Sequence, residues 1–358
     1  MKKILGFLIP VCILSFIGFW VSSAILGTTG EKNSSTDGLP SELVGQTLLF
    51  GETVDSGTHE WEIEDNEFNS IRVLCGSGKT VIQEGSGNTI LIKAQVPNGR
   101  SAYIGANGNY DDREVTIEVS PKFVSPSDFF KGIGNLIFSK DDAIFSDSVN
   151  VTITLPPRIY SKLDLELGSG KLYVDNVTAQ DNVINIGSGV FEMQRKDSFV
   201  SRQFSVTLGS GRAMINNMLA SSTEIIIGSG RFEFTGVSGK SEIEMGSGSG
   251  DIVFAGNFGE ANIDMGSGSL GLYVEKNGAV VSTNIASGSV KVNACGTEIK
   301  CGSSDDEGCI ILGKAVFSST TTKINLSLGS GSVKILDADE APNMNFEYFD
   351  NKPARFAY

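Results

Sequence analysis

Apolar and polar residues alternate on both sides of a short motif, Gly-Ser-Gly, that recurs along much of the chain. Copies begin at Gly168, Gly187, Gly209, Gly228, Gly246, Gly266 and Gly329, and an Ala-Ser-Gly variant begins at Ala286. An apolar residue stands one position before each copy, and another stands six positions after it. This period-two alternation predicts a strand with one buried face on each side of the motif.

The copies recur about every 20 residues, as expected for coils stacked in a repeat protein. The inward positions change parity across the motif, so the chain must bend there, and we expect glycine to permit positive φ angles at the bend. The step from Ala286 to Gly329 spans about two coils, and we expect "EIKCGSS" (298–304) to be a degenerate copy inside it. The predicted fold class is an all-β, parallel β-solenoid (β-helix) of about 20-residue rungs, each about 4.8 Å above the last.

Residues 1–27 are predicted to be a membrane anchor or signal segment. Two lysines precede an apolar, uncharged run, and residues 4–27 are long enough to cross a bilayer as an N-terminal transmembrane helix. A cleavable signal peptide is the alternative, because small residues end at Ala24. Basic residues on the short N-terminal side would place the rest outside the cytoplasm. We expect a single-pass cell-membrane protein with an extracytoplasmic C-terminal body, or a secreted protein after cleavage.

The remaining chain divides into five parts by composition. These are 28–45, a polar flexible tether; 46–124, irregular N-terminal β coils or a cap; 125–148, an insertion that could hold a short amphipathic helix; 149–338, the regular β-solenoid repeats; and 339–358, a C-terminal cap with proline and aromatic residues.

The segment "VNVTITLPPRIYSKLDLELGSGKLYVDNVTAQDNVINIGSG" (149–189) carries a family resemblance. An alternating strand that ends in Leu155-Pro156, followed by a strand, Gly-Ser-Gly and another strand, resembles the "putative adhesin" family of bacterial surface proteins. This family is related to the head GIN, or auto-transporter adhesin, domains. The resemblance covers about residues 60–338 and implies a right-handed β-solenoid on a bacterial envelope protein. It supplies no catalytic residue to carry over.

Composition narrows the function further. The net charge of −14 argues against a nucleic-acid partner, which would need a basic surface, and His59 is the single histidine of the chain. A phosphate-binding loop would open a helix, whereas a second strand follows each Gly-Ser-Gly copy. We therefore expect no nucleotide site, no catalytic residue and no cofactor, with Ca²⁺ kept as the one possible ion.

Charged residues at outward positions form two candidate binding faces. Acidic residues precede the motifs, namely Asp164, Glu166, Glu224, Glu242, Glu244 and Asp264, and basic residues follow them, among them Lys171, Arg212 and Arg231. Stacked carboxylates repel one another, and an oxygen-seeking cation could relieve this, so Glu242, Glu244 and Asp264 are the candidate calcium ligands. The alternative is that both sets simply keep a β surface soluble.

The cysteines predict core packing and one possible crosslink. Cys75 and Cys301 stand at inward positions, where a small apolar side chain is expected. Cys295 and Cys309 flank a predicted excursion from the repeats and could form a disulfide outside the cytoplasm. A fully reduced set is the alternative.

These observations together favour a membrane-tethered, non-enzymatic adhesion, binding or scaffolding module. Its partner would be a surface glycan, a cell-wall polymer or an envelope protein. An envelope-stress sensor or regulatory partner protein is one alternative. A carbohydrate-active β-helix enzyme is another, for which Asp181, Glu192 and Asp264 are available carboxylates although nothing in the sequence distinguishes them.

Overall fold

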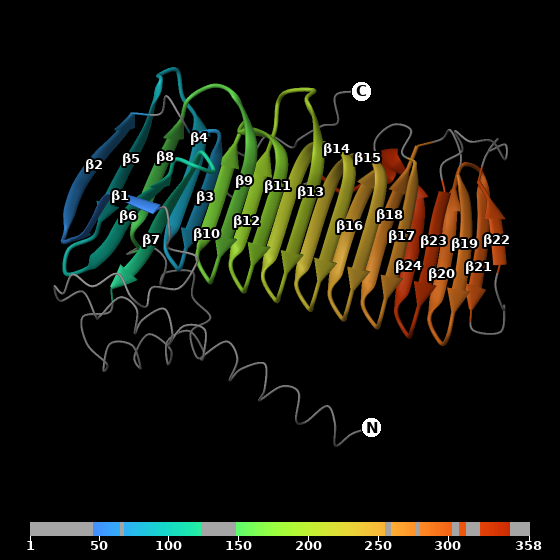
Figure 1. Ribbon diagram of the computed structural model, residues 1–358. Helices are drawn as coiled ribbons and strands as arrows, with labels where there is room; N and C mark the ends of the chain where they lie inside the picture. The colour runs from blue at the N-terminus through green and yellow to red at the C-terminus, as the bar shows by residue number, and fades with distance from the viewer. Residues whose placement is uncertain are drawn as a thin grey trace, which may run out of the picture. The chain divides into compact units, whose positions relative to one another are not determined.

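The described part of the protein is a β structure throughout (Figure 1). The computed structural model describes residues 46–64, 68–122, 148–254, 259–275, 279–302, 308–312 and 323–343, which form 24 strands and one short 3-10 helix. The predicted anchor and tether (1–45) lie outside these residues, as do the insertion 125–148 except for its last residue and most of the predicted C-terminal cap. No helix in the described ranges is long and apolar enough to span a membrane.

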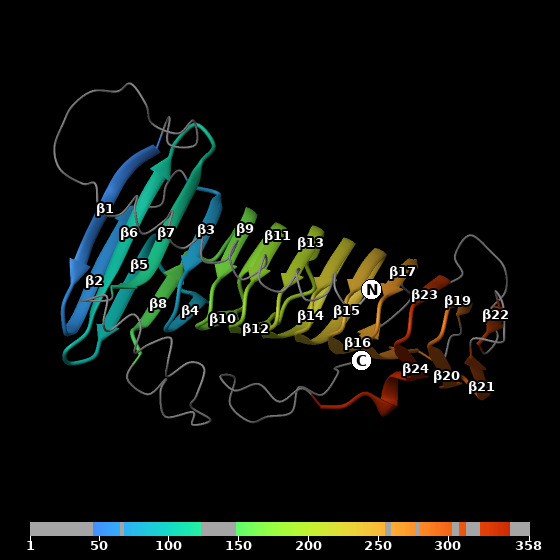
Figure 2. The same ribbon diagram turned by 90° about the horizontal axis from the view of Figure 1, so that it is seen from below.

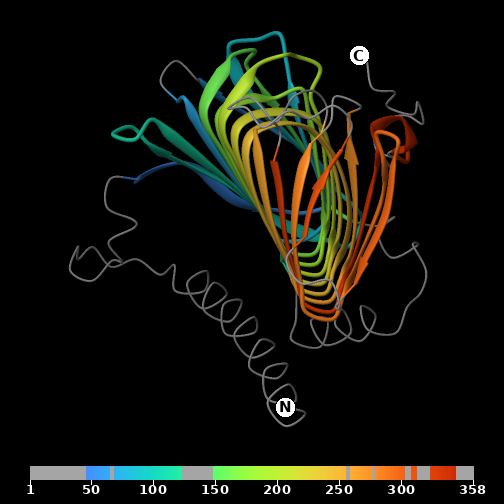
Figure 3. The ribbon, with the colours of Figure 1, turned by 90° about the vertical axis from the view of Figure 1, so that its right-hand side faces the viewer.

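The repeats build two arms that meet at a narrow edge, where the Gly-Ser-Gly corners lie (Figure 3). The first arm contains the strands that precede each corner: β3 (Ser70–Cys75), β9 (Ile159–Leu167), β11 (Thr178–Ile186), β13 (Val200–Leu208), β17 (Glu260–Met265), β19 (Val280–Ile285) and β23 (Lys323–Leu328). The second arm contains those that follow: β4 (Lys79–Glu84), β10 (Lys171–Asp175), β12 (Val190–Gln194), β16 (Ser249–Phe254), β18 (Ser269–Val274), β20 (Ser289–Ala294) and β24 (Ser332–Asp337). Two long strands, β14 (Arg212–Ile227) and β15 (Arg231–Met245), cross from the second arm to the first.

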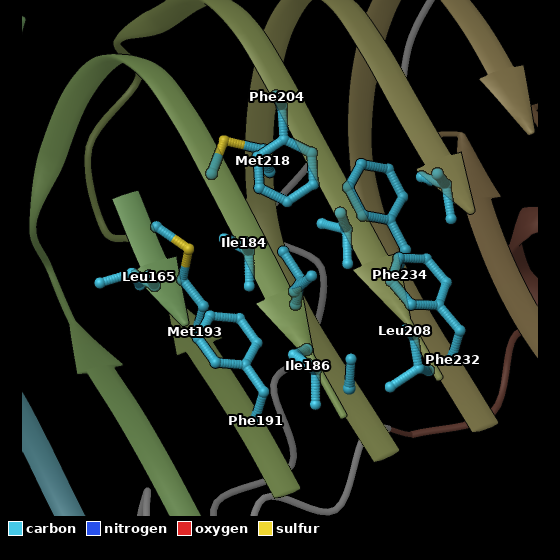
Figure 4. Packing of buried hydrophobic residues seen from close by; sticks show 14 of the residues in the cluster. Leu165, Ile184, Ile186, Phe191, Met193, Phe204, Leu208, Met218, Phe232 and Phe234 are labelled. Atoms are coloured by element: carbon cyan, nitrogen blue, oxygen red, sulfur yellow. The ribbon is translucent and has the colours of Figure 1, made fainter. Parts of the chain in front are cut away.

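Each repeat pairs in parallel with the next, so equivalent residues stack in rows. Ile184 of β11 lies beside Leu165 of β9 and Val206 of β13, and Met193 of β12 lies beside Val174 of β10. The inward rows of both arms are buried in one continuous apolar core. Figure 4 shows aromatic, aliphatic and sulfur-containing side chains filling the space between the arms. The predicted alternation is therefore confirmed by the burial of the inward residues.

Antiparallel strands end the stack on both sides. At the N-terminal end, β7 (Glu114–Lys122) and β8 (Asn150–Leu155) first add one more parallel strand to each arm, beside β3 and β4. Beyond them, β6 (Ser101–Asn109) and β1 (Gln46–Val54) extend the first arm as antiparallel strands, and β5 (Thr89–Val96) and β2 (Gly57–Glu64) extend the second. At the other end, β21 (Thr297–Gly302) pairs antiparallel with β20, and β22 (Gly308–Ile311) pairs antiparallel with β19. An antiparallel turn reverses the chain without another full coil.

The order of the last rungs in space differs from their order in sequence. β23 lies between β17 and β19, and β24 lies between β18 and β20, so a late rung is inserted between two earlier ones (Figures 1 and 2). The expectation that 298–304 adds a parallel coil is wrong, because β21 turns back on β20 as an antiparallel strand. Cys301 is nevertheless buried, as its inward position predicts.

The corner glycines are required for a reason other than the expected positive φ. Among the described motif copies only the early one, at Gly78, has a positive φ, of 99°. In the regular corners the backbones of successive rungs nearly touch: a Cβ on Gly230 would lie 2.5 Å from the carbonyl oxygen of Gly211, and one on Gly248 would lie 2.6 Å from that of Gly230. The ladder also continues through the corner, since Ser229 N–H donates to Gly209 O at 2.9 Å. Glycine therefore permits close stacking.

A buried polar cluster lies in the β11–β14 region, away from the corners. Arg195 is 2 % exposed, donates to Phe199 O at 2.9 Å and to Ser201 Oγ at 3.1 Å, and forms an ion pair with Asp197. Thr178 also donates to Asp197. Burial alone would raise the pKa of the Asp197 carboxyl, but the hydrogen bond from Thr178 and the charge and hydrogen bond of Arg195 lower it below its ordinary value of 3.8.

Replacement of a corner glycine should destabilise the stack. Gly230→Ala forces a methyl group against the Gly211 carbonyl and should lower the free energy of unfolding by about 2 to 3 kcal/mol. Ser229→Ala is the matched control, because Ser229 is exposed in the same corner. Chemical denaturation measures both variants. Equal stability of the two would contradict the close-approach explanation.

Removal of Arg195 should cost more than removal of its neighbour. Arg195→Ala should lower the free energy of unfolding by about 3 kcal/mol, because it leaves a partly buried carboxylate without its cation. Lys196→Ala, whose side chain is exposed and pairs with Asp175 at 3.2 Å, should cost less than about 1 kcal/mol.

The same contact makes stability depend on pH. Because the folded pKa of Asp197 is lowered, its contribution is present above the ordinary carboxyl pKa and is lost as pH falls through the folded value. Arg195→Ala should therefore flatten the acid side of the stability profile. An unchanged profile would show that the ion pair does not hold the proton off Asp197.

Candidate binding face

The outer face of the first arm carries two rows of mostly polar side chains, two and four residues before each corner. The parallel register aligns them from rung to rung. From β14 onward the rows are Ile226, Glu244, Asp264, Ser327 and Asn284, and Glu224, Glu242, Asn262, Asn325 and Ser282. Strand alternation explains this placement, because the residues between them point into the core.

A shallow groove of about 640 Å³ runs across these rows on β15, β17, β23 and β19. We call it the first-arm groove. Its polar lining consists of three carboxylates, three amides and three hydroxyl groups: Glu242, Glu244, Asp264, Asn262, Asn325, Asn284, Ser282, Thr283 and Ser327. The inserted strand β23 supplies Asn325 and Ser327, so the groove depends on the non-sequential order of the rungs.

Hydrogen bonds run along the groove from one rung to the next. Asn262 Nδ2 donates to Glu242 Oε1 at 3.1 Å. Asn325 Nδ2 donates to Asn262 Oδ1 at 2.7 Å and to Glu260 Oε1 at 3.0 Å. Lys240 Nζ lies 2.8 Å from Glu242 Oε1 at the margin. These contacts hold the amide and carboxylate groups in fixed positions on a rigid sheet.

The charge of Glu242 is stabilised by its neighbours. The hydrogen bond from Lys240 and then that from Asn262 lower the pKa of the Glu242 carboxyl. The same contact with Glu242 raises the pKa of Lys240. Both side chains are exposed, so the pair orients the carboxylate and contributes little to stability.

The three candidate calcium ligands all line the first-arm groove, but the structure does not assemble them into a metal site. Glu244 and Asp264 are paired on adjacent rungs, whereas Glu242 stands in the other row and contacts Lys240. In the described ranges, no three His, Cys, Asp or Glu side chains lie close enough together to hold an ion.

The other acidic candidates, Glu224, Asp164 and Glu166, lie at different distances from the first-arm groove. Glu224 lies on the neighbouring strand β14 and accepts a hydrogen bond from Ser205 at 3.1 Å. Asp164 and Glu166 lie on β9, several rungs away, and pair with Lys162 and Arg72, each at 2.7 Å. These two carboxylates therefore serve contacts between neighbouring residues of the sheet and lie outside the groove.

The basic candidates Arg212 and Arg231 do not form an open basic face. Both guanidinium groups lie 3.0 Å from Glu233 Oε1, and the Glu233 side chain is 7 % exposed. Lys171 stands in the same row of the second arm, two rungs before Arg212. The sequence interpretation missed Glu233, because a single glutamate among alternating positions gives no sign of the two arginines around it.

A second polar feature follows the corners of the late rungs. A groove of about 530 Å³ is lined only by serine and glycine from four corners, with two serines from each: Ser247, Ser249, Ser267, Ser269, Ser287, Ser289, Ser330 and Ser332. The earlier corners carry Lys171, Val190, Arg212 or Arg231 in place of the second serine. The change from Gly-Ser-Gly-Lys, Gly-Ser-Gly-Val or Gly-Ser-Gly-Arg to Gly-Ser-Gly-Ser is the sequence signal for this serine stripe, and it is not visible among the charged positions.

The structure tests only some of the predictions made for the cysteines. The Cys309 side chain lies outside the described part, so its disulfide with Cys295 stays a prediction. Cys295 lies in the turn between β20 and β21, where its N–H donates to Asp337 Oδ1 at 2.7 Å. Cys75 is buried, as predicted, and burial raises the pKa of its thiol to about 12.

The Glu242 contacts predict a specific titration. Lys240→Met should raise the pKa of Glu242 towards the ordinary carboxyl value, because the stabilising cation is lost. Lys323→Met, in the same outer row two rungs away, is the matched control and should leave the titration unchanged. NMR of labelled glutamate carboxyl groups measures both. An unchanged midpoint in Lys240→Met would contradict the assigned ion pair.

Comparison with solved structures identifies similar chains at low identity. A putative adhesin from Bacteroides fragilis NCTC 9343 is 14 % identical, with 78 % of this chain and 97 % of that chain covered and a TM-score of 0.42. A putative adhesin from Parabacteroides merdae ATCC 43184 is 12 % identical, with 79 % and 98 % covered and a TM-score of 0.41. A putative lipid binding protein from Parabacteroides distasonis ATCC 8503 is 14 % identical, with 79 % and 98 % covered and a TM-score of 0.40.

Comparison with curated proteins gives no match. The family model named Toastrack DUF4097 matches residues 53–336, which include the strands from β2 onward, all the corners and the inserted rung. The match confirms the family resemblance inferred from the repeats. The chain belongs to the Toastrack DUF4097 family.

Proposed function

We propose that this chain is a membrane-tethered, extracytoplasmic surface protein that binds a linear polysaccharide along the first-arm groove without catalysing a reaction. The observation that carries the proposal is the groove itself, in which amide, hydroxyl and carboxylate groups repeat over four rungs. The right-handed solenoid, the envelope location and the tether through residues 4–27 are part of the same proposal and rest on the sequence.

The groove suits an extended polymer better than a compact ligand. Its rows follow the solenoid axis with one polar group per rung, about 4.8 Å apart, which is close to the length of one sugar unit. Each contact is exposed and weak, but neighbouring contacts on one rigid sheet act together and raise the total affinity. A longer oligosaccharide should therefore bind more tightly than a short one.

The negative charge of the outer face of the first arm favours some classes of polysaccharide over others. Glu224, Glu242, Glu244 and Asp264 are exposed on this face, and the whole chain carries a net charge of −14. An anionic polymer would be repelled, whereas a neutral polysaccharide or one with amino groups would meet hydrogen-bonding and charge-complementary side chains. We therefore propose neutral or amino-sugar polymers as the ligand class.

The carboxylates considered for glycosidic cleavage support the non-enzymatic proposal. Asp181 lies on β11 of the first arm and forms an ion pair with Arg202. Glu192 lies on β12 of the second arm, and Asp264 lies on β17, several rungs from Asp181. A glycosidase needs two carboxyl groups on opposite sides of one bond. The structure does not bring these three residues together.

The proposal is tested with neutral and amino-sugar oligosaccharides of increasing length on a glycan array, with the full chain in detergent. Replacing Asn284 and Asn325 with alanine should weaken binding at least ten-fold, because two adjacent rungs lose their amides. Replacing Asn185 and Thr207, which are exposed in the outer row but outside the groove, is the matched control and should change nothing.

Three results would overturn this function. Binding to no oligosaccharide would reject the ligand class, and equal loss in both double variants would reject the groove. Appearance of shortened products on mass spectrometry would replace binding with catalysis.

A further inference from the structure

The inserted rung, formed by β23 and β24, joins two parts of the stack that have no other sheet pairing in the described ranges. β23 lies between β17 and β19, and β24 lies between β18 and β20 (Figure 1). We call β19, β20, β21 and β22 the end unit, because within the described chain they pair only with one another and with the inserted rung. The inserted rung therefore holds the end unit on the stack.

The registers on the two sides of the inserted rung would let the stack close without it. In the first arm Ser327 lies beside Asp264 on one side and beside Asn284 on the other. Asn284 follows Asp264 by 20 residues in the sequence, the usual spacing of two neighbouring rungs. The second arm has the same offset across β18, β24 and β20. The end unit can therefore pair with β17 and β18 after moving by one rung, about 4.8 Å, with no shift of register.

Direct pairing would also keep mostly apolar side chains in the core and provide an acceptor at the corner. The inward residues that would meet are Ala261, Ile263 and Met265 of β17 and Val281, Thr283 and Ile285 of β19. In the inserted state Gly329 N–H donates to Met265 O, and Ala286 N–H donates to Leu328 O, each at 2.8 Å. Without the inserted rung, Met265 O would accept from Ala286 N–H instead.

The corner contact between the inserted rung and the end unit leaves too little room for the residue that occupies it. Where the rung meets β17 and β18, glycine lies on glycine, and a Cβ on Gly329 would lie only 2.6 Å from Gly266 O. Where the rung meets the end unit, the equivalent residue is Ala286, which carries this methyl group. The end unit is therefore stacked on the rung less favourably than the Gly-Ser-Gly corners are stacked on one another.

The inserted state is nevertheless the stable state. Five apolar side chains of the rung are at most 3 % exposed, namely Ile324, Leu326, Leu328, Val333 and Ile335. Their transfer to water opposes release, so the released state is a minor one reached by local opening. The short 3-10 helix η3 (Ala338–Glu340) follows β24 and packs on the outer face against Val253 and Tyr273, so it does not lock the rung between the arms.

We propose that the inserted rung leaves the stack as a unit and that the end unit then closes directly onto β17 and β18. Release removes Asn325 and Ser327 from the middle of the first-arm groove and brings Asn284 next to Asp264. A polymer that spans all four strands of the groove binds the inserted state alone and shifts the equilibrium towards it. This last step rests on the proposed function, whereas release of the rung does not.

Disulfide trapping in the full chain tests the closure. Asp264→Cys with Asn284→Cys places two thiols two rungs apart, about 9.6 Å, which is too far for a disulfide. Closure brings them to one rung, about 4.8 Å, where the bond can form. Under an oxidant this pair should accumulate an intrachain disulfide at least ten-fold faster than Glu244→Cys with Ser327→Cys, a matched pair that is also two rungs apart but that closure does not bring together.

Mass spectrometry of the linked peptides measures both pairs. Equal rates would show general unfolding of the stack and would overturn the closure. No disulfide in either pair, or disulfides only between two copies of the chain, would overturn it as well.

Hydrogen exchange of the unmodified full chain gives an independent measurement. Ordinary fraying from the end of the stack would expose β19 and β20 before the inserted rung, because they lie outside it. We expect the reverse order, in which amides of 323–337 exchange at least ten-fold faster than those of 280–294. Equal or slower exchange of 323–337 would contradict release of the rung.

A hexamer of glucosamine separates this inference from the proposed function. The hexamer should slow the exchange of 323–337 and leave that of 190–194, which lies outside the groove, unchanged. If the glycan array shows binding of the hexamer but exchange is not slowed, the coupling between groove and rung is overturned. If the array shows no binding, the proposed function fails, and trapping and exchange of the free chain alone decide whether the rung is released.

Discussion

Close stacking of backbone on backbone at the corners is the constraint on which the structure depends. Successive corners hydrogen-bond to one another, and their glycines leave no room for a side chain between rungs. This contact aligns both arms at once, because a strand enters and leaves every corner. The apolar rows, the outer rows and the serine stripe all inherit their register from it. A shift of one residue at a corner would turn core side chains outward on the following strand.

The same stack of rungs gives the two arms outer faces with different properties. On the first arm the outward rows are exposed, and their amides and carboxylates bond from rung to rung. On the second arm the outward row is buried from Tyr173 to Glu233, and Arg212 and Arg231 both pair with Glu233. The polar side chains of the first-arm groove are therefore available to a ligand, whereas Glu233, Arg212 and Arg231 of the second arm pair with one another. The proposed binding role depends on this asymmetry.

Much of the fold could be predicted from the sequence, because alternation and spacing are local signals. The inward rows, from Leu165 to Ile335, follow directly from them. The insertion of β23 between β17 and β19 could not be predicted, since every corner has similar chemistry and any two rungs could pair. That insertion also completes the candidate site. Glu242, Glu244 and Asp264 could therefore be found from sequence, but their neighbour Asn325 could not.

In the second arm, the alternation of residues predicts the direction in which a side chain points better than it predicts the solvent exposure of that side chain. Parity correctly indicates that Tyr173 and Glu192 point away from the core, but exposure also depends on what lies over the sheet. A buried outward carboxylate is costly unless neighbouring groups compensate its charge, as Arg212 and Arg231 do for Glu233. By the same argument, the uncovered groups of the first arm are those best placed to meet a ligand.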